Sequence, residues 1–158
     1  DPLYIARSLV RFASEDIGLA DPQALIQALA AKDTVDFVGL PECDNALAQC
    51  VVYLATAPKS NALYTAMGAA KRAVHEQPNA PVPLHIRNAP TKLMKNLNYG
   101  AGYQYDHNAP EHFSGQRFLP ESMGDATFYT PGTLGFETEI KKRIDYWNRL
   151  RESKKTLS

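Results

Sequence analysis

Apolar residues recur at helical spacing through the first half of the chain, and proline or glycine interrupts each run. A carboxylate directly before proline, at Asp1-Pro2 and again at Asp21-Pro22, is typical of a helix start, because the acid caps free amides and proline fits the first turn. The first helix is predicted to end at Gly18 and the second within residues 33–36. The apolar spacing predicts buried faces made of Ile5, Leu9, Phe12 and Ala13 in the first helix and Leu25, Ala28 and Leu29 in the second.

Two further helices are predicted before residue 77. Pro41 opens the third, and Pro58 ends it, because proline costs about 3 kcal/mol in a helix interior. Its predicted buried face consists of Leu47, Val51, Leu54 and Ala55. The fourth helix spans residues 60–75, and its small side chains would let another helix approach closely, so we expect it at the centre of the packing. Its alanines are Ala62, Ala66, Ala69, Ala70 and Ala73.

Regular structure is expected to be sparse between residues 77 and 135. Four prolines within 77–90 exclude a continuous helix and predict an extended connection. A short helix over 91–97 and a glycine-tyrosine turn region over 98–105 follow. The aromatic runs 117–119 and 127–129 are predicted to pair as a small hairpin.

A closing helix is predicted from Gly135 to Glu152. The residues expected to be buried on this helix are Phe136, Ile140, Ile144 and Trp147. Its solvent-exposed face is expected to carry the ion pairs Glu137–Lys141, Glu139–Arg143 and Asp145–Arg149. Residues 153–158 are polar and expected to fray. The predicted fold class is all-α: one helical bundle over residues 1–152, with a proline-rich crossover and an irregular lobe.

Composition agrees with a globular domain of this size. Of the 158 residues, 44% are hydrophobic and 22% charged, and no apolar run approaches the ~20 residues that cross a bilayer, so we expect a cytoplasmic protein without membrane contact. The chain opens on Asp1 at what resembles an internal helix start, so we expect a piece of a longer protein.

Cys43 and Cys50 would lie about two turns apart on one helix, roughly 10 Å, too far for a disulfide. We expect both to be small, buried or half-buried apolar residues in a reducing compartment.

The charges are sorted into blocks along a chain whose net charge is zero. Residues 1–44 hold eight acids and three bases, whereas 45–105 hold six bases and one acid, Glu76. Residues 106–136 are acidic again, and the tail from Glu137 has seven bases and four acids. Such blocks can dock within one fold, on a neighbouring subunit or on a nucleic acid.

Motifs for catalysis and nucleotide binding are absent from the sequence. It contains no GxxxxGK[ST] loop, GxGxxG, GxSxG or HExxH, so we expect no catalytic and no cofactor-binding residue in this chain. The histidines at 75, 85, 107 and 112 match no tight metal-ligand spacing, and we expect no metal site.

Four basic residues are candidate contacts for DNA or another anion: Lys59, Arg87, Lys92 and Lys95. Lys59 lies at the corner between the third and fourth helices, where Ser60 or Asn61 would cap the next helix, so a plain capped turn is the structural alternative. The other three cluster around the start of the short helix, which Asn88 is expected to cap. A helix N-terminus favours anions, which predicts a phosphate site there.

Both features of this basic segment also have structural explanations. Arg87 could instead be buried and paired with an acid of the first block, such as Asp16 or Asp21. The tyrosines that follow, Tyr99, Tyr103 and Tyr105, could stack on single-stranded nucleic acid or could anchor their loop.

Several long segments of the sequence resemble those of one known family. They are DPLYIARSLVRFASEDIG at 1–18 with ADP at 20–22, VYLA leading into APKSN at 52–61, HIRNAPTKLMK at 85–95, and YG through YQY at 99–105. Together they resemble the C-terminal domain of the RarA/MgsA replication-associated recombination AAA+ ATPases, which are related to the eukaryotic Werner-helicase-interacting ATPase. The resemblance covers most of residues 1–135.

This resemblance implies a post-AAA+ oligomerisation domain that holds subunits together as a tetramer. The whole proteins would be clamp-loader-like, DNA-stimulated ATPases at stalled replication forks, nucleoid-associated in bacteria, with single-stranded-DNA-binding protein as a partner. ATP and Mg²⁺ would be bound upstream of Asp1, so no family ATP-site residue carries over to this chain. A nucleic-acid-binding module that uses residues 85–105 is the alternative function.

Overall fold

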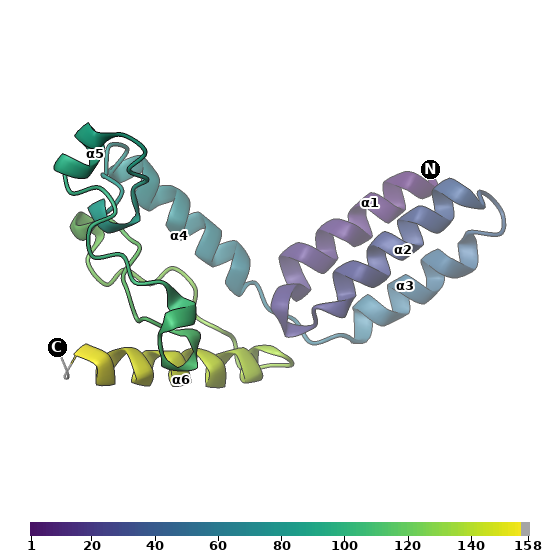
Figure 1. The fold of residues 1–158 in the computed structure, drawn as a ribbon. Coiled ribbons are helices and arrows are strands. Elements are labelled where there is room, and N and C mark those ends of the chain that lie inside the picture. The colour runs from purple at the N-terminus through teal and green to yellow at the C-terminus, as the bar shows by residue number, and fades with distance from the viewer. Residues whose placement is uncertain (156–158) are drawn as a thin grey trace. The chain divides into compact units, whose positions relative to one another are not determined.

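In a computed structural model of the chain, residues 1–155 are described, and all of their regular structure is helical (Figure 1). The all-α prediction is therefore confirmed. Single turns of 3-10 or π helix join the longer elements. The α-helices are α1 (Pro2–Phe12), α2 (Gln23–Phe37), α3 (Asp44–Thr56), α4 (Ala62–Glu76), α5 (Lys92–Asn96) and α6 (Glu137–Lys155).

The helix boundaries follow the capping signals in the sequence. Asp1 Oδ1 accepts a hydrogen bond from the Leu3 amide at 2.9 Å, and Asp21 Oδ1 accepts one from the Gln23 amide at 3.0 Å. Gly18 ends the first helical segment with a φ of 52°, which residues with a side chain rarely adopt. Both acid-proline starts and the glycine stop are therefore confirmed.

Backbone contacts divide the chain into two compact units. Unit 1 comprises residues 1–71 and 128–144, and unit 2 comprises residues 72–127 and 145–158. The helices α4 and α6 each contribute to both units. Residues 156–158 lie outside the described part of the chain.

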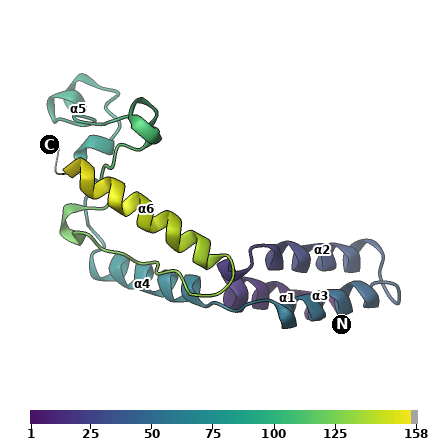
Figure 2. The same ribbon diagram turned by 90° about the horizontal axis from the view of Figure 1, so that it is seen from below.

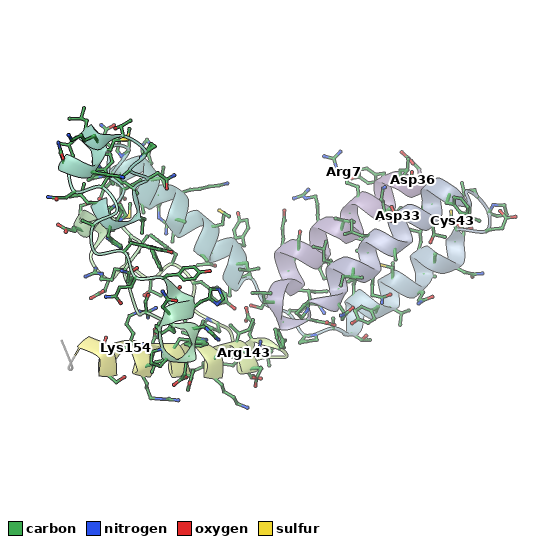
Figure 3. The ribbon with its side chains drawn as sticks, in the orientation of Figure 1. Arg7, Asp33, Asp36, Cys43, Arg143 and Lys154 are labelled. Atoms are coloured by element: carbon green, nitrogen blue, oxygen red, sulfur yellow. The ribbon has the colours of Figure 1, made fainter. Side chains whose placement is uncertain are left out.

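In unit 1, α1, α2 and α3 pack side by side as a three-helix bundle (Figures 1 and 2). The buried apolar residues of unit 1 are mostly small, which lets the helices approach closely. They are seven alanines and two cysteines, with four larger side chains: Ala6, Ala13, Ala20, Ala24, Ala28, Ala31, Ala66, Cys43, Cys50, Ile17, Val35, Leu47 and Leu54. Cys43 ends the loop before α3 (Figure 3), and both cysteines are free and buried, as predicted.

The predicted buried faces are only partly correct. Ala13, Ala28, Leu47 and Leu54 are buried as expected. Among the predicted core residues, however, the larger side chains Ile5, Phe12, Leu25, Leu29 and Val51 are exposed. The helices meet along alanine faces instead, so the large side chains lie beside the contact or on the outer surface.

The expectation that the alanine-rich α4 is central is wrong for the described chain. Ala66 is its only buried residue, and α4 makes no extensive backbone contact with another helix among residues 1–155. In unit 1 its first turn is held by the turn before it: the Ser60 hydroxyl accepts from the Ala62 amide at 3.2 Å.

Unit 2 has little helix and is organised by turns and ring contacts. The Phe113 and Trp147 rings lie 5.0 Å apart, and Arg151 lies over the Phe113 ring at 5.3 Å.

Residues 117–119 and 127–129 do not form strands, so the predicted hairpin is wrong. A lone two-stranded hairpin is marginal in water, and a 3-10 turn at Glu121–Met123 lies between the two runs instead. Helix α6 continues to Lys155, three residues beyond its predicted end at Glu152, and the rest of the tail that was expected to fray, residues 156–158, lies outside the described residues.

Candidate assembly and nucleic-acid interfaces

Helix α2 carries large apolar side chains on its outer face. Its buried face consists of alanines and one valine, whereas Leu25, Ile26 and Leu29 are exposed, and Phe37 is 93% exposed. Leu29 follows Leu25 by four residues and Ile26 by three, which places it on the same side of the helix as both. A face of this kind is typical of a surface that another molecule covers.

The charges beside this face are partly compensated within α2, where one lysine lies next to two aspartates. Asp33 and Asp36 lie on α2 (Figure 3), and Lys32 Nζ pairs with them at 3.0 and 2.8 Å. The Asp36 hydrogen bond, followed by that of Asp33, raises the pKa of Lys32. One net negative charge therefore remains on α2 beside its exposed apolar face.

Helix α4 presents a second apolar stripe. Leu63, Met67, Ala70 and Val74 follow the spacing i, i+4, i+7 and i+11, which places them along one side of the helix. Leu63, Met67 and Val74 are exposed, and Val74 is 63% exposed. Within residues 1–155 no other helix packs extensively against α4, although this stripe has the pattern of a helix–helix contact.

A buried carboxylate joins three segments of unit 1. Glu137, the first residue of α6, is 0% exposed. Its carboxylate accepts hydrogen bonds from the Ser60 hydroxyl at 2.7 Å, the Gly132 amide at 2.6 Å and the Tyr129 hydroxyl at 3.0 Å. Burial and the hydrogen bond to Glu137 raise the pKa of Tyr129 to about 12. The expectation that Glu137 lies on the wet face of the last helix is therefore wrong.

Two backbone hydrogen bonds hold the chain segments around Glu137 close together. The Phe136 amide donates to the Ala20 carbonyl at 2.8 Å, and the Ser60 amide donates to the Asp16 carbonyl at 2.8 Å. Gly135 has a φ of 57°, and a Cβ there would lie 2.8 Å from Pro58 Cγ and even closer to the Ala20 carbonyl oxygen. The junction thus fixes the start of α6 against the turn that leads into α4.

The outer side of α6 agrees better with expectation. Arg143 Nε pairs with Glu139 Oε1 at 3.2 Å, which confirms that predicted i,i+4 pair. Arg143 also lies over the Phe136 ring at 5.3 Å and is labelled near the start of α6 in Figure 3. Ile140 and Ile144 of the predicted stripe are half-buried, whereas Phe136 and Trp147 are exposed.

Lys59, in unit 1, is engaged within its own turn. Its Nζ donates to the carbonyls of Ala55, at 3.3 Å, and Ala57, and lies 5.8 Å from the centre of the Phe12 ring. Lysine at the C-terminal end of a helix compensates the free carbonyls there. The structure therefore gives Lys59 a capping role at the end of α3, which the sequence did not predict, while Ser60 caps α4 as the structural alternative expected.

Arg87, in unit 2, supports the loop that follows α5. Its Nε donates to the Val82 carbonyl at 2.6 Å and its Nη1 to the Tyr99 hydroxyl at 3.2 Å, and the guanidinium lies over the Tyr99 ring at 5.0 Å. These contacts lie within unit 2, whereas Asp16 and Asp21 lie in unit 1, where Asp21 Oδ2 accepts from the Tyr53 hydroxyl at 2.7 Å. Pairing of Arg87 with either acid stays a prediction. Tyr99 correspondingly anchors its loop, whereas Tyr103 and Tyr105 are exposed.

Lys92 and Lys95 are exposed on α5. The cap of α5 is Thr91, whose hydroxyl accepts from the Met94 amide at 3.2 Å, so the predicted Asn88 cap is wrong. A helix of five residues has too small a dipole to attract an anion by itself. Any anion contact here would therefore depend on the two lysine side chains.

Neither a metal site nor a membrane span emerges from the described residues. Within residues 1–155, no group of three or more histidine, cysteine, aspartate or glutamate side chains is placed to hold a metal ion. The His107 ring lies 5.1 Å from the His112 ring and 5.1 Å from the Tyr105 ring, tilted to both. In the same part of the chain, no helix is both long and apolar enough to span a bilayer.

Comparison with known proteins decides the family. The family described as "MgsA AAA+ ATPase C terminal" matches residues 1–148. The chain belongs to this family. Its relatives include "Replication-associated recombination protein A" of Coxiella burnetii, 49% identical over 99% of this chain and 36% of that protein, and of Escherichia coli K12, 46% identical over 91% and 32%. The "ATPase WRNIP1" of Dictyostelium discoideum is 49% identical over 82% of this chain and 15% of that protein.

The chain therefore spans about a third of the length of the bacterial relatives. Family membership confirms the resemblance drawn from the sequence: the chain matches the family described as the C terminal of the MgsA AAA+ ATPase, and its bacterial relatives are named replication-associated recombination protein A. The Glu137 junction and the exposed faces of α2 and α4 are the features that sequence reasoning missed.

Proposed function

We propose that this chain is the self-association domain of a DNA-dependent AAA+ ATPase that acts in replication, recombination and repair at stalled forks, and that it assembles as a tetramer. One observation carries the self-association: small residues fill the interior of unit 1 while large apolar residues lie outside. Alanine faces hold α1, α2 and α3 together, and within residues 1–155 the large apolar side chains of α2 and α4 remain exposed.

A second copy of the chain is the occupant that fits these faces best. Burying one exposed Leu, Ile, Met or Val side chain contributes about 1.5–3 kcal/mol, so several of them can outweigh the entropy lost on association. Zero net charge minimises repulsion between copies. The acidic and basic blocks of one chain also supply complementary surfaces, which closed symmetric oligomers require.

Charged substitutions on α4 test this proposal. Met67→Glu combined with Val74→Glu is expected to raise the concentration needed for assembly by at least about tenfold, because burying unpaired charge costs several kcal/mol. The readout is the mass from light scattering over a concentration series. Thr65→Glu is the matched control, since Thr65 is exposed on another side of α4.

Circular dichroism separates loss of assembly from loss of fold. Retained helicity with a lower mass supports an α4 interface. Unchanged assembly of the double variant, with helicity intact, would contradict a role for the α4 stripe.

We also propose that ATP hydrolysis belongs to the part of the longer protein that precedes residue 1, with ATP and Mg²⁺ bound there. This chain has no phosphate-binding loop in its sequence. Steady-state assays of the chain with and without DNA are expected to show no turnover above the buffer blank. Turnover that survives repeated purification would contradict this.

The second candidate function is nucleic-acid binding through residues 85–105. The observation in its favour is that Lys92 and Lys95 are exposed in a stretch, residues 77–105, that contains no acid. Binding would add to assembly rather than replace it. Single-stranded-DNA-binding protein as a partner, and a cytoplasmic, nucleoid-associated location, complete the proposal for the whole protein.

A further inference from the structure

The connection between α2 and α3 carries the most exposed large apolar side chain among the described residues. Phe37 is 93% exposed, and Val38 and Leu40 are 49% and 60% exposed. We call residues 37–40 the apolar tip. Phe37 follows Leu29 by eight residues, roughly 12 Å along α2, so the tip is separate from the apolar face at the start of that helix.

The backbone of the tip is anchored to the bundle beneath it. Cys43 is fully buried and belongs to one apolar cluster with Val35. The Val38 amide donates to the Thr34 carbonyl at 2.9 Å, and the Cys43 amide donates to the Gly39 carbonyl at 2.8 Å. An anchored segment loses little conformational entropy when a partner covers it, so the tip is preorganised for a contact.

Acidic side chains surround the tip. Residues 32–44 hold four acids and one base, and Asp36, Glu42 and Asp44 are exposed. Asp36 and Cys43 are labelled at this end of the bundle in Figure 3. Acids repel phosphate groups and one another, which disfavours a nucleic acid, an anionic membrane or the tip of a second copy as the cover. An apolar pocket bordered by lysine or arginine is the surface that complements the tip.

The tip lies at the end of the bundle where residue 1 lies. Ala6 of α1 shares the buried cluster of Val35 and Cys43, and the N-terminus lies beside the α2–α3 connection in both views (Figures 1 and 2). The chain spans about a third of its bacterial relatives, and the matching family is described as a C terminal. In the proposed function the ATPase part precedes residue 1, which joins it to the bundle beside the tip.

The size of the tip favours a partner that is covalently linked. An aromatic side chain buries about 150–250 Å², so the three apolar side chains of the tip bury at most about 500 Å². A stable interface between separate proteins buries about 800 Å² on each partner. A linked partner is present at an effective concentration on the order of millimolar, which suffices for a contact of this smaller size.

We propose that the apolar tip docks into an apolar pocket with a basic rim on the ATPase part that precedes residue 1. This rests on the proposed function, which places that part there. Phe37 is the central anchor, Val38 and Leu40 enlarge the contact, and Glu42 and Asp44 face the basic rim. Docking fixes the orientation of the ATPase part on the three-helix bundle.

Hydrogen exchange of the backbone amides in residues 37–42 tests the proposal. It is followed by mass spectrometry in the 158-residue chain and in the longer protein that contains it. Exchange in the longer protein is expected to be at least about tenfold slower, because docking covers the tip. In the 158-residue chain it should stay fast at every concentration up to tens of micromolar. ATP hydrolysis by the longer protein is measured in the same preparations.

The variant Phe37→Ser with Leu40→Ser is expected to abolish the difference in exchange between the two proteins. Glu42→Lys should reduce that difference about threefold, because it turns an acid against the basic rim into a base. Val52→Ser, at a 63% exposed valine on α3, is the matched control and should keep the full difference. Circular dichroism of each variant should show unchanged helicity, and Glu42→Lys keeps the test decisive if the double serine variant unfolds.

The other outcomes overturn the proposal in distinguishable ways. Equal exchange in the two wild-type proteins, with ATP hydrolysis present in the longer one, would overturn docking and leave the proposed function intact. A longer protein that hydrolyses no ATP would contradict the proposed function, and docking with it. Slow exchange in the 158-residue chain that disappears on dilution would show that a second copy covers the tip. A full difference in the double serine variant would equally overturn docking.

Discussion

Gly135→Ala is expected to destabilise unit 1 by more than about 3 kcal/mol, enough to prevent folding in a domain of ordinary stability. Two effects combine at this position. The φ of 57° disfavours any side chain, and the new Cβ would overlap the Ala20 carbonyl oxygen and lie 2.8 Å from Pro58 Cγ. Neither neighbour is the free end of a flexible side chain, so the backbone itself would have to move. Chemical denaturation followed by circular dichroism measures the loss.

Gly39→Ala separates the two effects. Gly39 has a φ of 77°, but a Cβ there would have no atom within 4 Å, so only the conformational cost of about 1–2 kcal/mol should remain. Equal losses of unfolding free energy for Gly135→Ala and Gly39→Ala would show that the close approach to Ala20 and Pro58 does not contribute to the destabilisation.

Glu137→Ala should cost about 3 kcal/mol, because it leaves three buried hydrogen-bond donors without their acceptor. These donors are the Ser60 hydroxyl, the Tyr129 hydroxyl and the Gly132 amide. In a chain of this size the loss corresponds to a fall in melting temperature of about 6–12 °C. Melting must be compared at one protein concentration, since assembly itself raises the apparent stability.

Glu139→Ala provides the matched control for Glu137→Ala. Glu139 is two residues along the same helix and pairs with Arg143 at a partly exposed site, so its loss should cost about 0.5 kcal/mol or less. Glu137→Gln keeps one acceptor oxygen and should fall between the two. A Glu137→Ala variant as stable as Glu139→Ala would contradict a structural role for the buried carboxylate.

Helix positions could be predicted from the sequence because their signals are local. Asp1-Pro2, Asp21-Pro22 and Gly18 act on amides and dihedral angles within a few residues, and the structure follows all three. The start of the third helix was less accurate: Pro41 is followed by a turn, and α3 begins at Asp44. Proline indicates where a helix can begin but does not require that it begins there.

The helix faces were harder to predict because periodicity assumes that the largest apolar residues are inside. In α2 the spacing of Leu25, Ala28 and Leu29 suggested one buried face, but only Ala28 is buried. That assumption fails in this chain, because its helices pack through alanines and its large apolar residues lie on the outer surface. The mismatch between pattern and burial is itself what self-association would produce.

The candidate site residues show where sequence reasoning ends. Glu137 had the spacing of a surface ion pair, yet its partners include Ser60, 77 residues earlier. Arg87 was expected to have a structural alternative, and within unit 2 its partners are the Val82 carbonyl and the Tyr99 hydroxyl, which the spacing did not predict. Contacts between remote segments depend on the whole fold, and no local spacing encodes them.

The central claim is self-association, and the mass of the wild-type chain in solution tests it most directly. Sedimentation equilibrium over a range that reaches tens of micromolar is expected to show a species near four times the 17.5 kDa of one chain. A single 17.5 kDa species throughout that range would contradict the account. The exposed faces of α2 and α4 would then have to be covered by another part of the longer protein.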